Sequence, residues 1–283
     1  MATSDFVQIR YDHPAEGVAR ITLARADTRN AQDRKMLYEI NTALDIAMHD
    51  DDVRVVILAA DGPHFSSGHH LGDGSKIGDH GPPVMGVGGY DQPGAEGYMA
   101  QEQEIYLGFC WRWRNLPKPT IAQVQGYCIF GGYMFTSAMD LIVAADDAMF
   151  LPSITQYFSA PWDVGVRKAK EILFQSRFVN AQEALRTGLA NMVVPRAELE
   201  RETLALAGRI AETDAFTLRM LKYAINNAQD EMGYHTAVRN AHSHHFLTRV
   251  QEYAQWDRGE GRGPKRMPGV EQALKKSRFA PEK

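Results

Sequence analysis

Two short segments contain the small residues and histidines best suited to chemistry. The first, Phe65-Ser-Ser-Gly-His-His-Leu71, follows an apolar strand-like run, and so does the second, Gly126-Tyr-Cys-Ile-Phe-Gly-Gly-Tyr-Met134. A strand that turns sharply at small residues leaves backbone N–H groups pointing into a cleft. Two such groups on one thioester oxygen would form an oxyanion hole, which stabilises the charge of an enolate as it develops. Either turn alone predicts only a tight turn, whereas the pair points to thioester chemistry.

The elements around these turns predict an α/β core. Alternating or continuous apolar runs predict strands, and apolar residues at helical spacing predict helices. The expected strands cover residues 6–11, 17–24, 53–60, 120–126 and 141–145, with the first two as a hairpin. The expected helices cover residues 33–52, 95–113, 166–176, 181–187, 197–212, 215–229 and 234–256. Strand signals stop after residue 163, and residues 62–95 are expected to form a long loop that is functional or mobile.

The composition narrows the class of protein. The chain has 283 residues, 44% of them hydrophobic, which is enough for one main core and a modest appendage. A formal net charge of -4 disfavours a general nucleic-acid binder, although the tail after Asp257 is basic and is expected to be solvated or to form a local patch for phosphates or an acidic subunit surface. Cys110 and Cys128 lack zinc or redox spacing. With no leader pattern and no apolar run long enough to span a membrane, we expect a cytoplasmic protein without nucleic-acid partners.

Several segments, in order along the chain, resemble the crotonase (enoyl-CoA hydratase/isomerase) superfamily across most of residues 6–230. They are residues 21–31, 53–58 with 65–68, 118–127 with 130–132, and 138–145. The resemblance implies an α/β fold with a crotonase-like spiral of strand-strand-helix repeats in residues 1–195 and a helical trimerisation region with a basic tail in residues 196–283. It also implies a homotrimer or a dimer of trimers. CoA would be part of the substrate, with no tightly bound cofactor and no metal.

The same resemblance assigns site residues. The N–H groups of His69 and Gly131 become the oxyanion donors, and the loop around Arg25, Arg29 and Ala31 faces the CoA nucleotide. For the two arginines, a solvated turn charge is the alternative to a phosphate contact. The further residues expected at the acyl-CoA site are Ser67, Gly68, Gly132, Tyr133, Met134, Ser153 and Tyr157. The two tyrosines either donate hydrogen bonds to an intermediate or serve packing.

The sequence departs from the family at its acid-base positions. Hydratases of the family use two glutamates, but the matching positions hold Met134 and, beside an apparent one-residue gap, Ser153. Neither side chain exchanges protons well near neutral pH, so the sequence argues against standard two-glutamate hydration. The resemblance implies Asp163 as the best replacement, because other members of the superfamily place an active-site carboxylate in this neighbourhood. If its surroundings are apolar, burial would raise the pKa of its carboxyl. The alternative is that Asp163 caps a helix that begins at Val164.

Histidines and glutamates offer further candidates. His69 and His70 lie at the first turn, where an imidazole can act as a base or orient water. A metal at His70 and Asp73 is disfavoured, because adjacent residues on a turn diverge and no third ligand is fixed. Glu102 and Glu104 lie on the helix expected over residues 95–113. One of them could cover the cleft, but a solvated helix face is expected.

The C-terminal helices are expected to mediate self-association. Four aromatic residues are expected to be exposed on a monomer and to need partners for burial: Tyr234, Phe246, Tyr253 and Trp256. His242, His244 and His245 are expected at a subunit contact or on the exposed surface rather than around a metal.

These features predict an enzyme of the enoyl-CoA hydratase or isomerase type, which acts on an acyl-CoA through an oxyanion-stabilised enolate. A first alternative is a crotonase-fold hydrolase or carbon-carbon bond-cleaving enzyme on a cyclic or carboxylated acyl-CoA, with Asp163 and His70 as acid-base groups. A second alternative is a non-catalytic acyl-CoA-binding protein that keeps the turns and lacks the chemistry.

Overall fold

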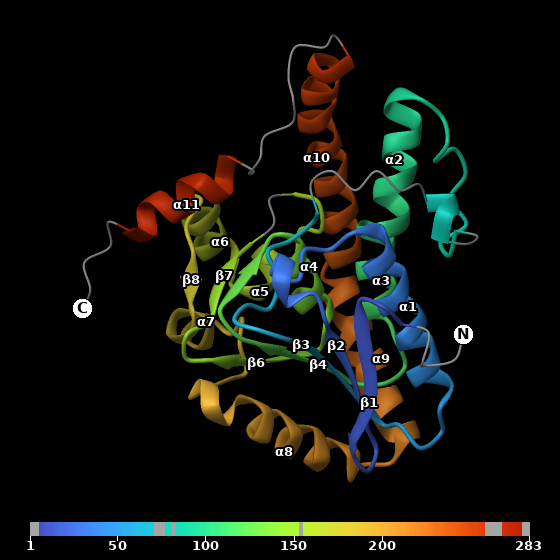
Figure 1. The fold of residues 1–283 in the computed structure, drawn as a ribbon, viewed down its shortest axis with the longest axis vertical. Helices are drawn as coiled ribbons and strands as arrows, with labels where there is room; N and C mark the ends of the chain where they lie inside the picture. The colour runs from blue at the N-terminus through green and yellow to red at the C-terminus, as the bar shows by residue number, and fades with distance from the viewer. Residues whose placement is uncertain (1–5, 71–76, 81–82, 153–154, 258–267, 279–283) are drawn as a thin grey trace.

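The computed structural model describes residues 6–70, 77–80, 83–152, 155–257 and 268–278, and its centre is a six-stranded sheet (Figure 1). The strand order is β1-β2-β3-β4-β6-β9. The predicted antiparallel hairpin is present as β1 (Ile9–Ala15) and β2 (Val18–Leu23). The other strands pair in parallel: β3 (Val55–Ala60), β4 (Thr120–Val124), β6 (Leu141–Ala145) and β9 (Met192–Val194). Because β3 and β4 are parallel neighbours, the turns that follow them leave the same edge of the sheet.

Both faces of this sheet are covered at its centre, which is why β3 is apolar without interruption. All six residues of β3 are buried. Val55 and Ile57 pack in a cluster with α8 (Leu199–Ala211), whereas Val56 and Leu58 pack in a cluster with α1 (Arg34–His49). Figure 1 shows α8 and α1 on opposite sides of the sheet. Successive side chains of a strand point to opposite faces, so a strand covered on both faces buries every residue.

A second sheet supplies the second strand of each strand-strand-helix repeat. β4 passes through Gly126 into β5 (Tyr127–Ile129) and then into α4 (Gly131–Ala138), while β6 is followed by β7 (Met149–Leu151) and α5 (Ala160–Asp163). The second sheet has the order β5-β7-β8, with β8 at Val179–Asn180. Gly126 has φ +54°, and a Cβ there would lie 2.6 Å from His64 Nδ1, so the bend between the two sheets requires glycine. This is the strand-strand-helix repeat that the sequence predicts.

The predicted C-terminal helices are present. They are α6 (Val166–Gln175), α7 (Ala181–Thr187), α8, α9 (Ala215–Glu231) and α10 (Tyr234–Asp257), and α11 (Pro268–Arg278) follows them. The prediction that strands stop after residue 163 is wrong, because β8 and β9 lie in this part of the chain. These two strands have two and three residues, which is too short for a period to be visible in the sequence.

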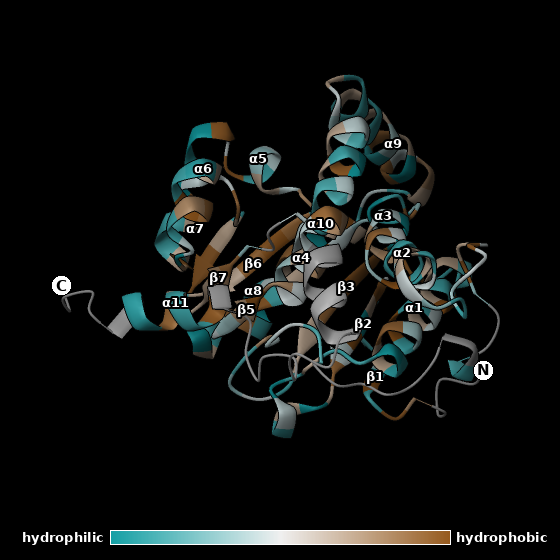
Figure 2. Ribbon diagram, turned by 90° about the horizontal axis from the view of Figure 1, so that it is seen from above, coloured by the Kyte–Doolittle hydropathy of each residue, from teal (hydrophilic) through white to brown (hydrophobic). Residues whose placement is uncertain are grey.

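The segment between β3 and β4 differs in part from the prediction. The helix expected over residues 95–113 is two helices, α2 (Gly94–Ile105) and α3 (Leu107–Arg114), separated at Tyr106, where φ is −111° and ψ is −72°. Before α2, the described residues of the long loop contain one short 3-10 helix, η3 (Ile77–His80). Figure 2 shows hydrophobic strands in the interior, with more hydrophilic residues on the surrounding helices and loops.

Candidate active site

The first turn is held by a neighbouring loop from the N-terminal end of the chain. The Gln32 N–H donates to the Gly68 carbonyl (2.9 Å), and the His70 N–H donates to the Gln32 carbonyl (2.8 Å). Gln32 and His69 thus form a parallel bridge. In a parallel ladder of this kind, Gly68 and His70 bond to Gln32, and His69, which lies between them, directs its own N–H away from the neighbouring strand. The backbone N–H of His69 therefore points away from Gln32.

The second turn lies directly against the first. Gly131 begins α4, and the first N–H groups of a helix have no partner within that helix. A Cβ on Gly131 would lie 2.6 Å from His69 Cε1 and 2.7 Å from His69 Nδ1. A Cβ on Gly68 would lie 3.3 Å from the Gly131 nitrogen. The two turns therefore adjoin at the two predicted oxyanion donors, and the site accepts only glycine at position 131.

Phe130 gives the second turn a strained backbone. It has φ +42° and ψ −96°, a conformation that glycine adopts readily and an L side chain does not. Such a conformation costs roughly 1–3 kcal/mol and persists where the surrounding structure fixes it. The Phe130 N–H donates to the Leu151 carbonyl (2.9 Å), which holds the turn against β7. The direction of the first N–H groups of α4 is thus set by tertiary contacts.

Asp163 lies beside α4, where it accepts hydrogen bonds from neutral hydroxyl groups. Its Oδ2 accepts from the Tyr133 hydroxyl (2.8 Å) and from Ser137 Oγ (3.1 Å). The residue as a whole keeps some exposed surface, but its carboxyl group is enclosed. Burial raises the pKa of this carboxyl, and the neighbouring hydroxyl groups of Ser159, Tyr133 and Ser137 oppose the rise without cancelling it.

The alternative role of Asp163 as a helix cap is wrong. Asp163 is the last residue of α5, and its own N–H donates to the Ser159 carbonyl. The next helix begins at Val166 with Gly165 as its N-cap, which has φ +80° and no side-chain cap bond. The chain turns at Gly165 after a short helix, so Asp163 lies three residues before the N-terminus of α6 and does not cap it.

The imidazole of His69 belongs to a buried polar cluster that the sequence did not predict. His69 Nε2 lies 3.1 Å from Gln156 Oε1, and Gln156 Nε2 donates to Glu102 Oε2 (2.6 Å). Glu102 is 2% exposed, so the expectation of a solvated helix face is wrong. His242 and His245, predicted at a subunit contact or on the surface, are also buried, with Nε2 atoms 3.7 and 3.8 Å from Glu102 Oε2. The long helix α10 covers α2 here and thereby encloses the carboxylate.

Glu104 is also buried, but it has a different set of partners. It accepts from the Tyr38 hydroxyl (3.0 Å) and from the backbone N–H groups of Val84 (2.6 Å) and Met85 (2.9 Å). The expectation of a solvated face is therefore wrong for Glu104 as well. Its three donors hold the loop before α2 against α1, which makes it a structural anchor.

The loop predicted to face the CoA nucleotide is bonded to the first turn. Arg25 Nη1 pairs with Asp33 Oδ2 (2.5 Å) and also donates to the Ala31 carbonyl (3.2 Å). Arg29 is exposed at φ +56°, and its carbonyl accepts from the Ser67 N–H (2.9 Å). Arg25 therefore stabilises the loop internally, and Arg29 keeps its charge at the surface.

The remaining predicted residues fall into distinct surroundings. Met134 is fully buried in the core, and Gly132 lies against Ser66, which a Cβ would approach at 3.0 Å. Tyr157 is buried, and its hydroxyl accepts from that of Tyr234 (2.9 Å). His70 is exposed on the first turn. Ser153 and Asp73 lie outside the described residues.

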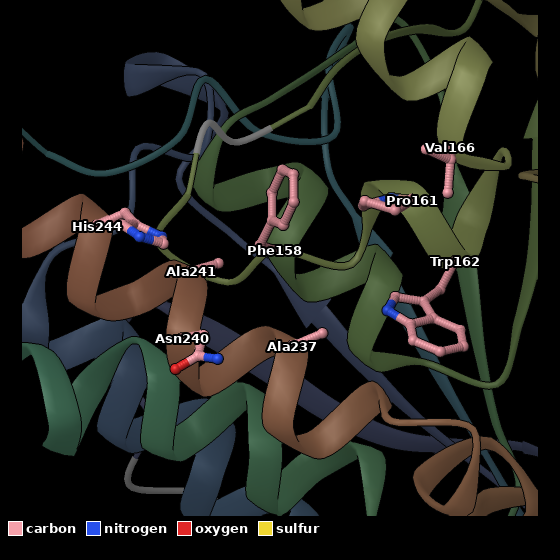
Figure 3. A pocket seen from close by; sticks show the side chains of 8 residues that line it. All are labelled: Phe158, Pro161, Trp162, Val166, Ala237, Asn240, Ala241 and His244. Atoms are coloured by element: carbon pink, nitrogen blue, oxygen red, sulfur yellow. The ribbon is translucent and has the colours of Figure 1, made fainter.

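An apolar hollow of about 470 Å³ lies beside α5 (Figure 3). Trp162, next to Asp163, is on one side, and one face of α10 forms the other. Its lining residues are Phe158, Pro161, Trp162, Val166, Ala237, Asn240, Ala241 and His244. Neither His69 nor Gly131 is among them, so the hollow is distinct from the adjoining turns.

The described part of the chain contains neither a cluster suited to a metal ion nor a helix suited to crossing a membrane. No group of three or more His, Cys, Asp or Glu side chains there is arranged to hold a metal ion. Over the same residues, no helix combines the length and the apolar character that crossing a membrane needs.

Known proteins resemble this chain over nearly its whole length. Residues 13–82 and 87–261 match the family model described as enoyl-CoA hydratase/isomerase. The chain is 38% identical to EchA13 of Mycobacterium tuberculosis, which carries an enoyl-CoA hydratase name, over 98% of this chain and 90% of that protein. A crystal structure from Mycobacterium smegmatis whose description names an enoyl-CoA hydratase has 38% identity and a TM-score of 0.77, covering 88% of this chain and 97% of that one. An enoyl-CoA hydratase/isomerase structure from Xanthobacter autotrophicus Py2 has 30% identity and a TM-score of 0.74, covering 98% and 100% of the two chains.

Proposed function

Because the chain belongs to the enoyl-CoA hydratase/isomerase family, we propose that it is an enzyme that acts on an acyl-CoA thioester through an enolate. The family and the crotonase fold that the sequence predicts are both confirmed. One observation carries the proposal: Gly131, at the N-terminus of α4, lies directly against His69. The His69 N–H points away from Gln32, with which His69 forms a parallel bridge. Two N–H groups that donate hydrogen bonds to the thioester oxygen would lower the barrier to enolate formation, and loss of one such donor costs roughly 2.7–4 kcal/mol.

Asp163 is the group that we propose to exchange a proton with the intermediate. The first position where the family carries a glutamate holds Met134, which cannot exchange protons. Asp163 has an enclosed carboxyl with a raised pKa and lies against Tyr133, two residues beyond Gly131. A carboxyl whose pKa is raised toward neutral pH is better matched to proton transfer than an ordinary one.

For the type of reaction, we propose hydration or isomerisation that does not use the family's usual pair of glutamates. The relatives' names include both activities. The enclosed Asp163 and the imidazole at the first turn also support the alternative of hydrolysis or carbon-carbon bond cleavage on a cyclic or carboxylated acyl-CoA. Turnover of a panel of acyl-CoAs, with products identified by mass spectrometry, separates these reactions from each other and from binding without chemistry.

CoA is proposed as the handle of the substrate rather than as a resident cofactor. The loop at residues 25–31 supports this, because its backbone is bonded to the first turn and its Arg29 side chain is exposed. A phosphate group near this loop would meet a cation without displacing the pair between Arg25 and Asp33.

Substitution of Gly131 tests the oxyanion hole directly. We expect Gly131→Val to reduce turnover by about 10²-fold or more, because the side chain would collide with His69 at the donor site. Gly208→Val is the matched control, since a Cβ on Gly208 meets nothing within 4 Å. Circular dichroism verifies that both variants fold. Normal turnover by a folded Gly131→Val protein contradicts the assignment.

We further propose that the protein forms a homotrimer or a dimer of trimers. The prediction that Tyr234 is exposed is wrong, because it is buried against Tyr157. Among the described residues, α9 carries more exposed large apolar side chains than any other element, with Phe216 65% and Ile225 67% exposed. Apolar side chains concentrated on one helix favour burial against another subunit. Light scattering at micromolar concentration checks this, and a monomer contradicts it.

A further inference from the structure

A continuous line of polar side chains runs from the first turn to the C-terminal helix α10. It begins at the His69 ring, passes through the amide of Gln156, and reaches the carboxylate of Glu102. Gln156 and Glu102 are 7% and 2% exposed. Buried polar groups arranged in series constrain one another's hydrogen-bond roles, because each donor needs an acceptor.

The carboxylate at the far end fixes which atom of Gln156 faces His69. Burial raises the pKa of Glu102, but interactions with His242, His245 and Gln156 outweigh it and hold the pKa below its ordinary range. An ionised carboxylate only accepts hydrogen bonds, so the amide of Gln156 must present its NH₂ group to Glu102. Its oxygen is then left to face His69.

This arrangement determines the tautomer of His69. The Gln156 oxygen accepts, so the proton of the neutral imidazole lies on Nε2, and Nδ1 is the acceptor nitrogen. The ring is also packed against Tyr106, with centroids 4.0 Å apart. Its Nδ1–Cε1 edge lies against Gly131, because a Cβ there would come within 2.6–2.7 Å of both atoms. The acceptor nitrogen is therefore placed beside the proposed oxyanion hole.

Glu102 is itself held in place from several elements. Its Oε1 accepts from the Tyr98 hydroxyl one turn earlier on α2 (2.7 Å). From α10, the Nε2 atoms of His242 and His245 approach Oε2 at 3.7 and 3.8 Å, which are ion-pair distances rather than hydrogen bonds. The titratable side chains facing this carboxylate are thus one tyrosine and two histidines.

We propose that Gln156 and Glu102 are positioning residues that orient His69 as a catalytic base, with Nδ1 accepting the proton removed from the acyl-CoA. The inference rests on the proposed function, since it requires an acyl-CoA enolate at this turn. In the step, the C–H bond next to the thioester breaks, and its electron pair forms the carbon-carbon double bond of the enolate. The negative charge moves to the thioester oxygen, and the proton bonds to Nδ1. Both ring nitrogens then carry protons, and the Glu102 charge, one amide group away, stabilises the imidazolium.

Deuterium exchange at the carbon next to the thioester tests this step by itself. Butyryl-CoA is incubated with the full-length protein in D₂O, and mass spectrometry follows deuterium uptake. We expect His69→Gln to lower the exchange rate by about 10²-fold or more, because the amide keeps the contact with Gln156 but cannot take a proton. Binding of butyryl-CoA, measured by calorimetry, should stay at its wild-type strength.

Glu102→Gln tests the positioning role. Loss of the negative charge disfavours the imidazolium, so the limb of the exchange-rate profile that rises with pH should move to lower pH. Glu104→Gln is the matched control on the same helix, because its carboxylate serves Tyr38 and the backbone of residues 84–85. It should lower stability without moving this limb. A limb that stays in place in Glu102→Gln overturns the positioning role.

The Gly131→Val protein separates failure of this inference from failure of the proposed function. Wild-type exchange that is lost in both Gly131→Val and His69→Gln supports the base. Exchange lost in Gly131→Val but retained in a folded His69→Gln overturns His69 as the base and leaves the proposed function standing. No exchange by the wild type, or normal exchange by Gly131→Val, overturns the proposed function and this inference together.

Discussion

Asp163 and Glu102 are both enclosed carboxyl groups, yet their surroundings drive their pKa values in opposite directions. Asp163 is bonded to hydroxyl groups of Tyr133 and Ser137, and its pKa is raised above the ordinary 3.8. Glu102 has two imidazoles and an amide around it, and its pKa is lowered below the ordinary 4.5. Burial alone raises both values. The kind of partner, rather than the depth of burial, decides the direction in which each carboxyl pKa moves.

The contrast matches two different tasks. A carboxyl with a raised pKa gains and loses a proton nearer to neutral pH, whereas one with a lowered pKa stays charged throughout that range. We therefore assign proton exchange to the Asp163 region and a constant negative charge to the Glu102 region. If the two regions responded alike to removal of charge, this assignment would fail.

The largest expected effect is on catalysis in the Asp163 region. Asp163→Asn preserves shape but cannot transfer a proton, so we expect the chemical step to slow by about 10²-fold or more with acyl-CoA binding retained. Single-turnover kinetics and calorimetry measure the two quantities separately. Deuterium uptake into butyryl-CoA should persist in this variant if His69 removes the first proton. Normal turnover by Asp163→Asn, with loss of turnover in a folded His70→Ala protein, would transfer the acid-base role to His70.

The next effect concerns stability, and its sign should differ between the two regions. A lowered carboxyl pKa stabilises the fold above the ordinary value of 4.5, and this contribution is lost as pH falls through the folded-state pKa. Glu102→Gln should therefore lower the free energy of unfolding at neutral pH, by about 1–3 kcal/mol for a buried charged hydrogen bond. The deficit should shrink toward acid pH.

Asp163→Asn should do the reverse. A raised carboxyl pKa favours the fold at low pH, and that contribution is lost as pH rises through the folded-state value, so ionised Asp163 weakens the fold at neutral pH. Removal of the ionisable group should increase stability near pH 7 and change little below pH 3.8. Urea unfolding of both variants across this pH range provides the comparison. Deficits of the same sign in both variants at pH 7 would contradict the opposed environments.

The smallest expected effect is from Tyr133→Phe. It removes one neutral hydrogen bond to Asp163, worth about 0.5–1.5 kcal/mol, and leaves Ser137 in place. Since that bond favours the ionised carboxyl, its loss should raise the pKa of Asp163 further. The pH–rate profile should move to higher pH by about one unit or less. Tyr38→Phe, which removes the corresponding bond to Glu104, should leave the profile in place.

The sequence predicts the oxyanion turns because local chemistry determines them. Position 131 requires glycine because two backbones approach each other closely there. A strand that is buried on both faces, such as β3, can be recognised by its unbroken apolar run. These signals lie within short windows of the chain. Asp163 became a candidate through the resemblance to the family, and its two possible roles, a helix cap and an enclosed acid, differ in where the helix after Gly165 begins.

The Glu102 cluster was missed because it depends on contacts between distant segments. Gln156 and Glu102 are 54 residues apart, and the two histidines lie on another helix entirely. The one available signal was the spacing of His242 and His245, which places both on one face of α10, but nothing local shows that this face is buried. Exposure of a polar residue is a property of tertiary packing, so a charged helix face was assigned to solvent.

Phe130 has a consequence for the order of events in folding. A phenylalanine does not hold φ +42° by itself, so this turn forms only once β5 and β7 are paired and Leu151 can accept its N–H. The oxyanion turn should therefore be unformed in the folding transition state. Substitutions at Phe130 should then change the unfolding rate while leaving the folding rate nearly constant. The part of the molecule closest to the chemistry is, on this view, assembled last and released first.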